Sequence, residues 1–122
     1  MESNPMTNSR LYHNPRCSKS RAALGLLHAR GQTPQIVTYL DTAPTVDELR
    51  ALVAMLEITA RCLLRSGEQE YADLGLADPT KTDAELLAAM AAHPRLIERP
   101  IFVSGGRAVI GRPPERVLEL LG

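Results

Sequence analysis

The residues best suited to chemistry lie in one short segment, HNPRCSKS at positions 13–20. Cys17 stands where an apolar stretch gives way to a predicted helix. The start of a helix carries partial positive charge and unpaired backbone N–H groups. These favour a thiolate over a thiol and can also hold an oxyanion. The segment therefore predicts a nucleophilic sulfur beside an anion-binding loop, with Lys19 and Arg21 as cationic neighbours.

Ser20 stands where a Cys-x-x-Cys motif would carry its second thiol. Its hydroxyl is expected to donate a hydrogen bond to the Cys17 sulfur, or, as part of a residue in the first helical turn, to bond backbone, or both. Because the local second thiol is missing, a mixed disulfide on Cys17 needs another thiol to resolve it. Glutathione is the expected source and Cys62 the alternative. The apolar sequence beside Cys62 favours a packing role for that residue.

Three arginines could form an anion clamp with the loop. Arg99 and Arg112 flank a predicted β-hairpin at its outer ends, which antiparallel pairing brings together. With Arg65 they could form a forked cluster suited to a tetrahedral oxyanion, although each arginine alone is typical of a solvated surface. His13 precedes Cys17 by four residues. It is expected to bind the loop or the anion, or else to be a strand-end histidine bonded to backbone.

Length and composition set the protein class. The 122 residues suit one domain, and the formal net charge of zero argues against a general nucleic-acid binder. No apolar run reaches the roughly 20 residues of a membrane span. The polar N-terminus lacks a signal-peptide hydrophobic region, so a cytoplasmic location is the default expectation. Two cysteines are too few for a typical zinc site, and no metal is expected.

The order of predicted elements indicates an α/β protein. Residues 1–8 are expected to be a disordered tail, and residues 9–122 a single domain. A βαβ unit, a helical middle, a hairpin around Gly105-Gly106 and a final helix form a thioredoxin-type arrangement. The predicted strands are 9–13, 35–40, 101–103 and 108–110; the predicted helices are 18–30, one from Thr45, 60–65, one turn at 71–74, one from Thr82 to about 92, and one from 112 onward.

These motifs, in this order, resemble those of the glutathione/glutaredoxin-dependent arsenate reductases. The resemblance covers nearly everything from Leu11 to Leu121. It is carried by YHNPRCSKSR at 12–21, YLDTAPT at 39–45, LLR at 63–65, YADLGL at 71–76, HP at 93–94, IERPI at 97–101 and GRP at 111–113.

The resemblance implies a thioredoxin-like mixed four-stranded sheet with flanking helices and a helical insertion. It implies that Cys17 is the catalytic nucleophile and that Arg65, Arg99 and Arg112 bind arsenate. It also implies a cis peptide bond before Pro100. His13, Asn14 and Ser20 would then support the site.

The implied reaction is reduction of arsenate to arsenite. Cys17 forms a thiolate–arsenate adduct, glutathione attacks the adduct, and glutaredoxin reduces the mixed disulfide. The expected partners are therefore arsenate, glutathione as co-substrate and glutaredoxin, with no bound cofactor, nucleic acid or membrane. Two alternatives stay open: a general glutaredoxin-like thiol–disulfide oxidoreductase, and a redox-sensing regulator that binds RNA polymerase. The missing second cysteine and the three arginines favour the reductase.

Overall fold

The computed structural model describes residues 9–121, and the chain divides into two units. The described part of the first unit is residues 9–39 and 99–121, and the second unit is Leu40–Glu98. The disordered tail predicted for residues 1–8 lies outside the described residues. The single domain predicted for residues 9–122 stays a prediction.

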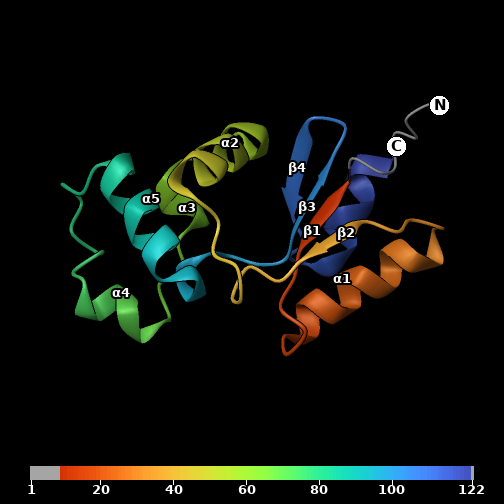
Figure 1. Ribbon diagram of the computed structural model, residues 1–122, viewed down its shortest axis with the longest axis horizontal. Helices are drawn as coiled ribbons and strands as arrows, with labels where there is room; N and C mark the ends of the chain where they lie inside the picture. Colours follow the sequence, from red (N-terminus) through yellow and green to blue (C-terminus); the bar gives the residue numbers. More distant parts are fainter. Residues whose placement is uncertain (1–8, 122) are drawn as a thin grey trace. The chain divides into compact units, whose positions relative to one another are not determined.

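The first unit contains a mixed four-stranded sheet in the order β2-β1-β3-β4 (Figure 1). Its strands are β1 (Arg10–Tyr12), β2 (Gln35–Val37), β3 (Ile101–Ser104) and β4 (Arg107–Ile110). β1 pairs parallel with β2 and antiparallel with β3, and β3 pairs antiparallel with β4. This confirms the expected sheet, although the first two strands end earlier than predicted.

The predicted hairpin between β3 and β4 is confirmed. Gly105 and Gly106 have φ values of 62° and 78°, a backbone conformation that residues with a Cβ rarely adopt. Two such residues in succession make a two-residue turn whose twist matches that of the strands. The hairpin register pairs Ile101 with Ile110, which brings the outer ends of the two strands together.

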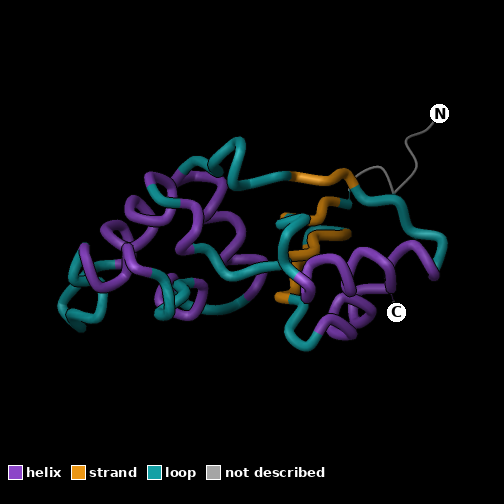
Figure 2. The backbone as a smooth tube through the Cα atoms, turned by 90° about the horizontal axis from the view of Figure 1, so that it is seen from below, coloured by secondary structure: helices purple, strands orange, loops and turns teal. Residues whose placement is uncertain are grey.

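Helix α1 (Ser18–Ala29) and the 3₁₀ helix η3 (Pro114–Leu121) cover one face of this sheet (Figure 2). α1 is rich in Ala and Leu, which favour helix, and Gly31 follows its C-terminus with φ 76°. Side chains at paired positions of three strands meet both helices in one buried cluster: Leu11, Phe102, Val109, Ala23, Leu27 and Val117.

The C-terminal segment differs from the expected helix in being 3₁₀. A 3₁₀ helix has three residues per turn, so residues three apart align on one face. Val117 and Leu120 have this spacing, as do Leu118 and Leu121, and all four pack against the buried cluster or belong to it. The apolar side chains of this segment thus complete the buried cluster of the sheet unit.

The second unit consists of helices, which confirms the expected helical insertion. They are α2 (Val46–Leu56), α3 (Ala60–Leu63), α4 (Gln69–Asp73), α5 (Asp83–Ala92) and the 3₁₀ helix η2 (Pro94–Leu96). A threonine precedes three of them, and its hydroxyl oxygen accepts a hydrogen bond from the backbone N–H of the third helical residue: Thr45, Thr59 and Thr82. The Thr82–Glu85 capping box is complete.

The helical unit has its own apolar core, around α5. The buried side chains include Leu49, Leu52, Leu63, Leu86, Leu87, Met90 and Leu96. A single antiparallel bridge, Leu64 with Ile97, joins the end of α3 to the end of η2. Across residues 9–121, no helix has the length and apolar character needed to cross a membrane.

Candidate functional site

Cys17 is the N-cap residue of α1, as the sequence predicts. Its backbone is extended (φ −95°, ψ 125°), and its side chain is buried with 9% exposure. The Cys17 N–H donates to the Asn14 carbonyl at 3.0 Å, and the Cys17 carbonyl accepts from the Arg21 N–H at 3.0 Å. The sulfur is therefore held at the start of the helix by backbone bonds on both sides.

The loop before Cys17 is fixed by side chains as well. The buried Ser20 hydroxyl accepts a hydrogen bond from the Asn14 N–H at 3.2 Å. Asn14 Oδ1 in turn accepts from the Arg16 N–H at 3.0 Å. Arg21 Nη1 donates to the Pro15 carbonyl at 3.0 Å. Of the two contacts expected for Ser20, the structure contains the backbone bond, and the sulfur receives its hydrogen bond from elsewhere.

Replacing Ser20 with alanine is expected to destabilise the protein by about 1–3 kcal/mol, because the part-buried Asn14 N–H loses its acceptor. The measurement is the free energy of unfolding from urea titration. Ser18→Ala is the matched control, since Ser18 lies in the same helical turn and is exposed. Equal stability of the two variants would contradict the role given to the Ser20 hydroxyl.

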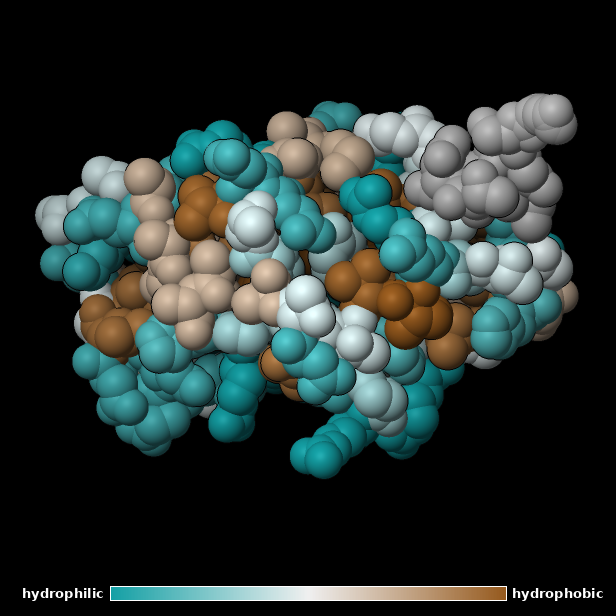
Figure 3. All heavy atoms as spheres, in the orientation of Figure 1, coloured by the Kyte–Doolittle hydropathy of each residue, from teal (hydrophilic) through white to brown (hydrophobic). Residues whose placement is uncertain are grey.

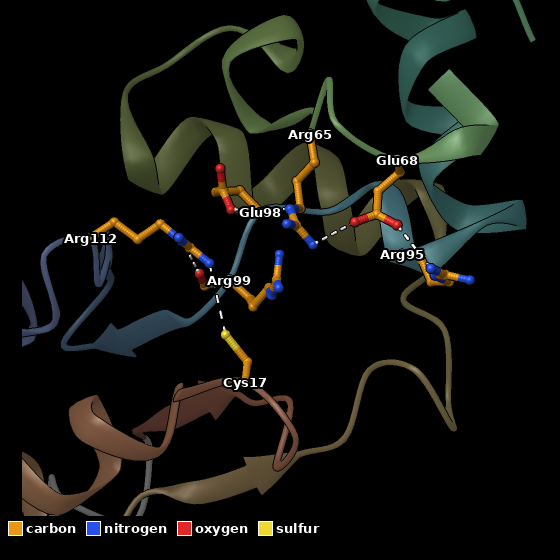
Figure 4. Close-up of polar contacts among 7 residues, drawn as sticks. All are labelled: Cys17, Arg65, Glu68, Arg95, Glu98, Arg99 and Arg112. Atoms are coloured by element: carbon orange, nitrogen blue, oxygen red, sulfur yellow. Dashed lines mark hydrogen bonds and ion pairs between the residues drawn. The ribbon is translucent and has the colours of Figure 1, made fainter. Parts of the chain in front are cut away.

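The donor to the sulfur is Arg112, in the segment after β4. Arg112 Nη2 lies 3.8 Å from Cys17 Sγ, and Arg112 Nε donates to the Arg99 carbonyl at 2.7 Å (Figure 4). The Arg99 carbonyl thus fixes one edge of the guanidinium while another nitrogen reaches the sulfur. Arg99 and Arg112 lie together at the outer ends of the hairpin, as antiparallel pairing predicts. The bond between Arg99 and Pro100 is cis, as the resemblance implies.

Gly111 lets the chain pass closely beside the start of β3. Its N–H donates to the Pro100 carbonyl at 2.9 Å. A Cβ at position 111 would lie 2.9 Å from Pro100 Cγ and 3.0 Å from Val117 Cγ1, which is closer than ordinary contact. A glycine is therefore required directly before Arg112, and its close packing helps to fix the backbone position of that arginine.

His13 lies at the end of β1, where the loop begins. Its N–H donates to the Val37 carbonyl at 2.9 Å, the backbone bond expected of a strand-end residue. The side chain is 6% exposed, and Nδ1 is buried without a hydrogen-bond partner in the described part of the chain. Burial lowers the pKa of His13 below its usual 6.5, and the positive charge of Arg21 lowers it further. His13 is thus a buried, neutral side chain at neutral pH.

The lowered pKa of His13 predicts a loss of stability in acid. The unfolded chain binds a proton on His13 near pH 6.5, while the folded protein binds it at lower pH. Between the two values the unfolded state holds more protons, so the free energy of unfolding falls as the pH falls below about 6.5. Urea titrations of the wild type and His13→Gln test this. The free energy of unfolding of the wild type minus that of His13→Gln should become smaller between about pH 7.5 and about pH 5.5.

The exposed His28 supplies the control for that measurement. His28→Gln removes a histidine from the same unit without removing a buried one. A difference between wild type and His13→Gln that stayed constant across this range would contradict the burial argument.

Arg65 belongs to the helical unit, where it lies just after α3. Its N–H donates to the Leu96 carbonyl at 2.8 Å. Arg65 Nη1 lies 2.9 Å from Glu68 Oε2, and Arg65 Nε lies 3.6 Å from Glu98 Oε1 (Figure 4). Glu68 Oε1 also pairs with Arg95 Nη2 at 3.1 Å. Arg65 thus has carboxylate neighbours, which neither periodicity nor motif spacing indicated in the sequence.

The packing role expected for Cys62 is wrong. Cys62 is exposed on α3, a helix of four residues whose buried side chains are Ala60 and Leu63. Thr59 Oγ1 donates a hydrogen bond to Cys62 Sγ at 3.3 Å. The apolar neighbours in the sequence point to the other side of so short a helix. Both cysteines are free thiols.

No group of three or more His, Cys, Asp or Glu side chains in the described residues is placed to hold a metal ion. At Cys17 the structure places the sulfur beside hydrogen-bond donors. These are the start of α1 and the Arg112 guanidinium. A sulfur nucleophile beside a guanidinium suits reaction with an oxyanion.

Comparison with known proteins places this chain in a family. The model of the ArsC family matches residues 12–120. The chain is 44% identical over 117 residues to the arsenate reductase of Neisseria meningitidis serogroup A, covering 95% of this chain and all of the relative. It is 48% identical over 114 residues to the uncharacterized protein YfgD of Escherichia coli, covering 93% and 96% of the two chains.

A solved structure of an arsenate reductase is also similar to this chain. The arsenate reductase from Vibrio cholerae superimposes with a TM-score of 0.89 at 50% identity, covering 91% of this chain and 95% of that one. The likeness thus extends over both units and includes the segments that carry Cys17, Arg65, Arg99 and Arg112.

Proposed function

Because the chain belongs to the ArsC family, we propose that it is an oxidoreductase that reduces arsenate to arsenite. The observation that carries the proposal is the Cys17 sulfur at the start of α1, with Arg112 Nη2 3.8 Å away. The arsenate reductases among its relatives support the choice of oxyanion.

In the first step, the Cys17 thiolate attacks the arsenic atom of arsenate. A sulfur–arsenic bond forms, and one arsenate oxygen leaves as water after taking up protons. Backbone N–H groups at the helix start and the Arg112 guanidinium are positioned to stabilise negative charge on the remaining oxygens. Arsenic is still pentavalent at this stage.

Arg99 and Arg65 complete the proposed set of oxyanion ligands. Arg99 lies at the same end of the hairpin as Arg112 and holds it through the backbone carbonyl. Arg65 enters the proposal through the family resemblance, on the motif LLR at 63–65. Planar guanidinium groups suit this role because each can offer two parallel N–H donors to a tetrahedral oxyanion.

The reducing electrons come from thiols outside the loop. A glutathione thiolate attacks Cys17 Sγ, so that a sulfur–sulfur bond forms while the sulfur–arsenic bond breaks. The electron pair of the broken sulfur–arsenic bond stays on arsenic, which leaves as trivalent arsenite. A thiol of glutaredoxin then takes the glutathione from Cys17 by disulfide exchange and regenerates the Cys17 thiol. Ser20 at the motif's second position supports the need for an external thiol.

The test is arsenite formation by the purified protein. Arsenite is expected when arsenate, glutathione and glutaredoxin are all present. Formation should drop when either thiol component is omitted. Absence of arsenite from the complete mixture, with a folded protein of reduced Cys17, would overturn the proposed function.

A further inference from the structure

Charge is unevenly distributed along a chain whose formal net charge is zero. The helical unit, residues 40–98, holds eleven Asp and Glu against five Lys and Arg. The described part of the sheet unit holds nine Lys and Arg against two acids, Glu115 and Glu119. Between Ser9 and Leu40 there is no acidic residue at all. The unit that carries Cys17 is therefore strongly basic.

Three of these cations lie within four residues of Cys17. Arg16, Lys19 and Arg21 are exposed, whereas Cys17 is buried at the centre of the segment. The ion pairs within residues 9–121 involve none of these three side chains. We call Arg16, Lys19 and Arg21 the basic rim. Its three cations are exposed and flank the buried Cys17 in the sequence.

The basic rim opposes the ordinary charge preference of a helix. The N-terminal end of a helix favours acidic side chains, and cations there cost stability. The first turns of α2 and α5 follow the preference with two acids each, whereas the first turn of α1 has none. Lys19 and Arg21 lie in or beside that first turn. The cations at the start of α1 therefore lower the stability of the helix at the end that carries Cys17.

We propose that the basic rim binds the carboxylates of an anionic thiol co-substrate and so directs its sulfur to Cys17. The inference rests on the proposed function, in which an external thiol must attack Cys17 Sγ. Glutathione carries two carboxylates and a net negative charge at neutral pH. Charge complementarity with the basic rim then selects it over neutral and cationic thiols.

The exposed hydrophobic residues offer little to recognise such a molecule. The large hydrophobic side chains that are exposed in residues 9–121 are Ile36, Leu40 and Leu74. On the face drawn in Figure 3, hydrophobic residues lie in small patches bordered by hydrophilic ones. A small, flexible, charged tripeptide gains more from exposed cations than from such patches.

Thiol–disulfide exchange at Cys17 tests the proposal without arsenate. The Cys17 thiolate attacks a symmetrical disulfide, forms a mixed disulfide and releases one thiol, so that atoms and electrons balance. Three disulfides are compared: glutathione disulfide (anionic), 2-hydroxyethyl disulfide (neutral) and cystamine (cationic). Mass spectrometry in a Cys62→Ser background reports the rate at Cys17 alone. The neutral disulfide reports the intrinsic reactivity of the sulfur.

For each charged disulfide, the exchange rate is divided by the rate with the neutral disulfide. The preference is the ratio for glutathione disulfide over the ratio for cystamine, and a free cysteine peptide gives its reference value. In the wild type this preference is expected to be about tenfold or more larger than in the peptide. Each of Arg16→Gln and Lys19→Gln should reduce that preference about two- to fivefold, the scale of one exposed charge pair. Added salt should weaken it as well.

Arg30→Gln is the matched control. Arg30 is exposed, lies at the other end of α1 and carries the same charge. If Arg30→Gln lowers the preference as much as Lys19→Gln does, the overall charge is responsible and the basic rim is not a binding site. If Arg16→Gln and Lys19→Gln leave the preference unchanged, the proposal is overturned. The proposal is also overturned if these two variants slow only the transfer of glutathione from Cys17 to glutaredoxin. The basic rim would then bind the surface of glutaredoxin.

This exchange separates the inference from the proposed function. A protein that forms no arsenite but shows the rim-dependent preference would refute arsenate reduction and retain the anionic thiol site. A protein that reduces arsenate with equal efficiency from glutathione and from cysteamine would keep the function and overturn the site.

Discussion

Replacing Cys17 with serine is expected to lower arsenite formation by at least about 10³-fold, the scale of loss when a covalent nucleophile is removed. A serine hydroxyl at this N-cap position would keep the helix start, since serine is a favourable N-cap residue. It would not form the sulfur–arsenic bond or the disulfide that supplies electrons to arsenic. The measurement is steady-state arsenite formation with glutathione and glutaredoxin, alongside thermal unfolding to show that the variant is folded.

Cys62→Ser is the matched control for this experiment. Cys62 is the other free thiol of the chain, and it is exposed. If glutathione resolves the adduct, Cys62→Ser should keep arsenite formation within about twofold of wild type, since surface substitutions away from a site change little. A large loss in Cys62→Ser would show that Cys62 takes part as a resolving thiol. Activity retained by Cys17→Ser would remove the basis of the mechanism.

Replacing Arg112 with alanine is expected to reduce kcat/KM for arsenate by about 10²–10³, the effect of removing one preorganised donor from an oxyanion site. Arg112 is fixed by the Arg99 carbonyl at 2.7 Å and reaches the Cys17 sulfur at 3.8 Å. Arg112→Lys should recover little of the loss. A lysine ammonium is a compact point charge that cannot bond the carbonyl through one nitrogen and face the sulfur with another.

Arg107→Ala is the control for charge, because Arg107 is exposed on β4 of the same hairpin. It should leave kcat/KM near that of wild type. The exchange of Cys17 with a neutral disulfide, measured on Arg112→Ala, separates the proposed reductase from a glutaredoxin-like enzyme. A reductase loses far more arsenate reduction than disulfide exchange. Equal losses in both reactions would favour a general effect on the sulfur over oxyanion binding.

Much of this protein could be predicted from its sequence. Helix starts, turns and strand order depend on residues close together in the chain. Thr82 with Glu85 forms the predicted capping box, and Gly105-Gly106 forms the predicted hairpin turn. The placement of Cys17 at the start of α1 follows from the same local signals. Arg99 and Arg112 could be predicted as partners because antiparallel strands bring their outer ends together.

The tertiary structure decided which side of an element each residue occupies and what it touches. Cys62 is exposed although its sequence neighbours are apolar, because a helix of four residues buries one narrow side. Ser20 bonds the Asn14 N–H, and the hydrogen bond to the Cys17 sulfur comes from Arg112, 95 residues away in the chain. Local propensity acts within a few residues, whereas burial and side-chain partners depend on segments that meet only when the chain has folded.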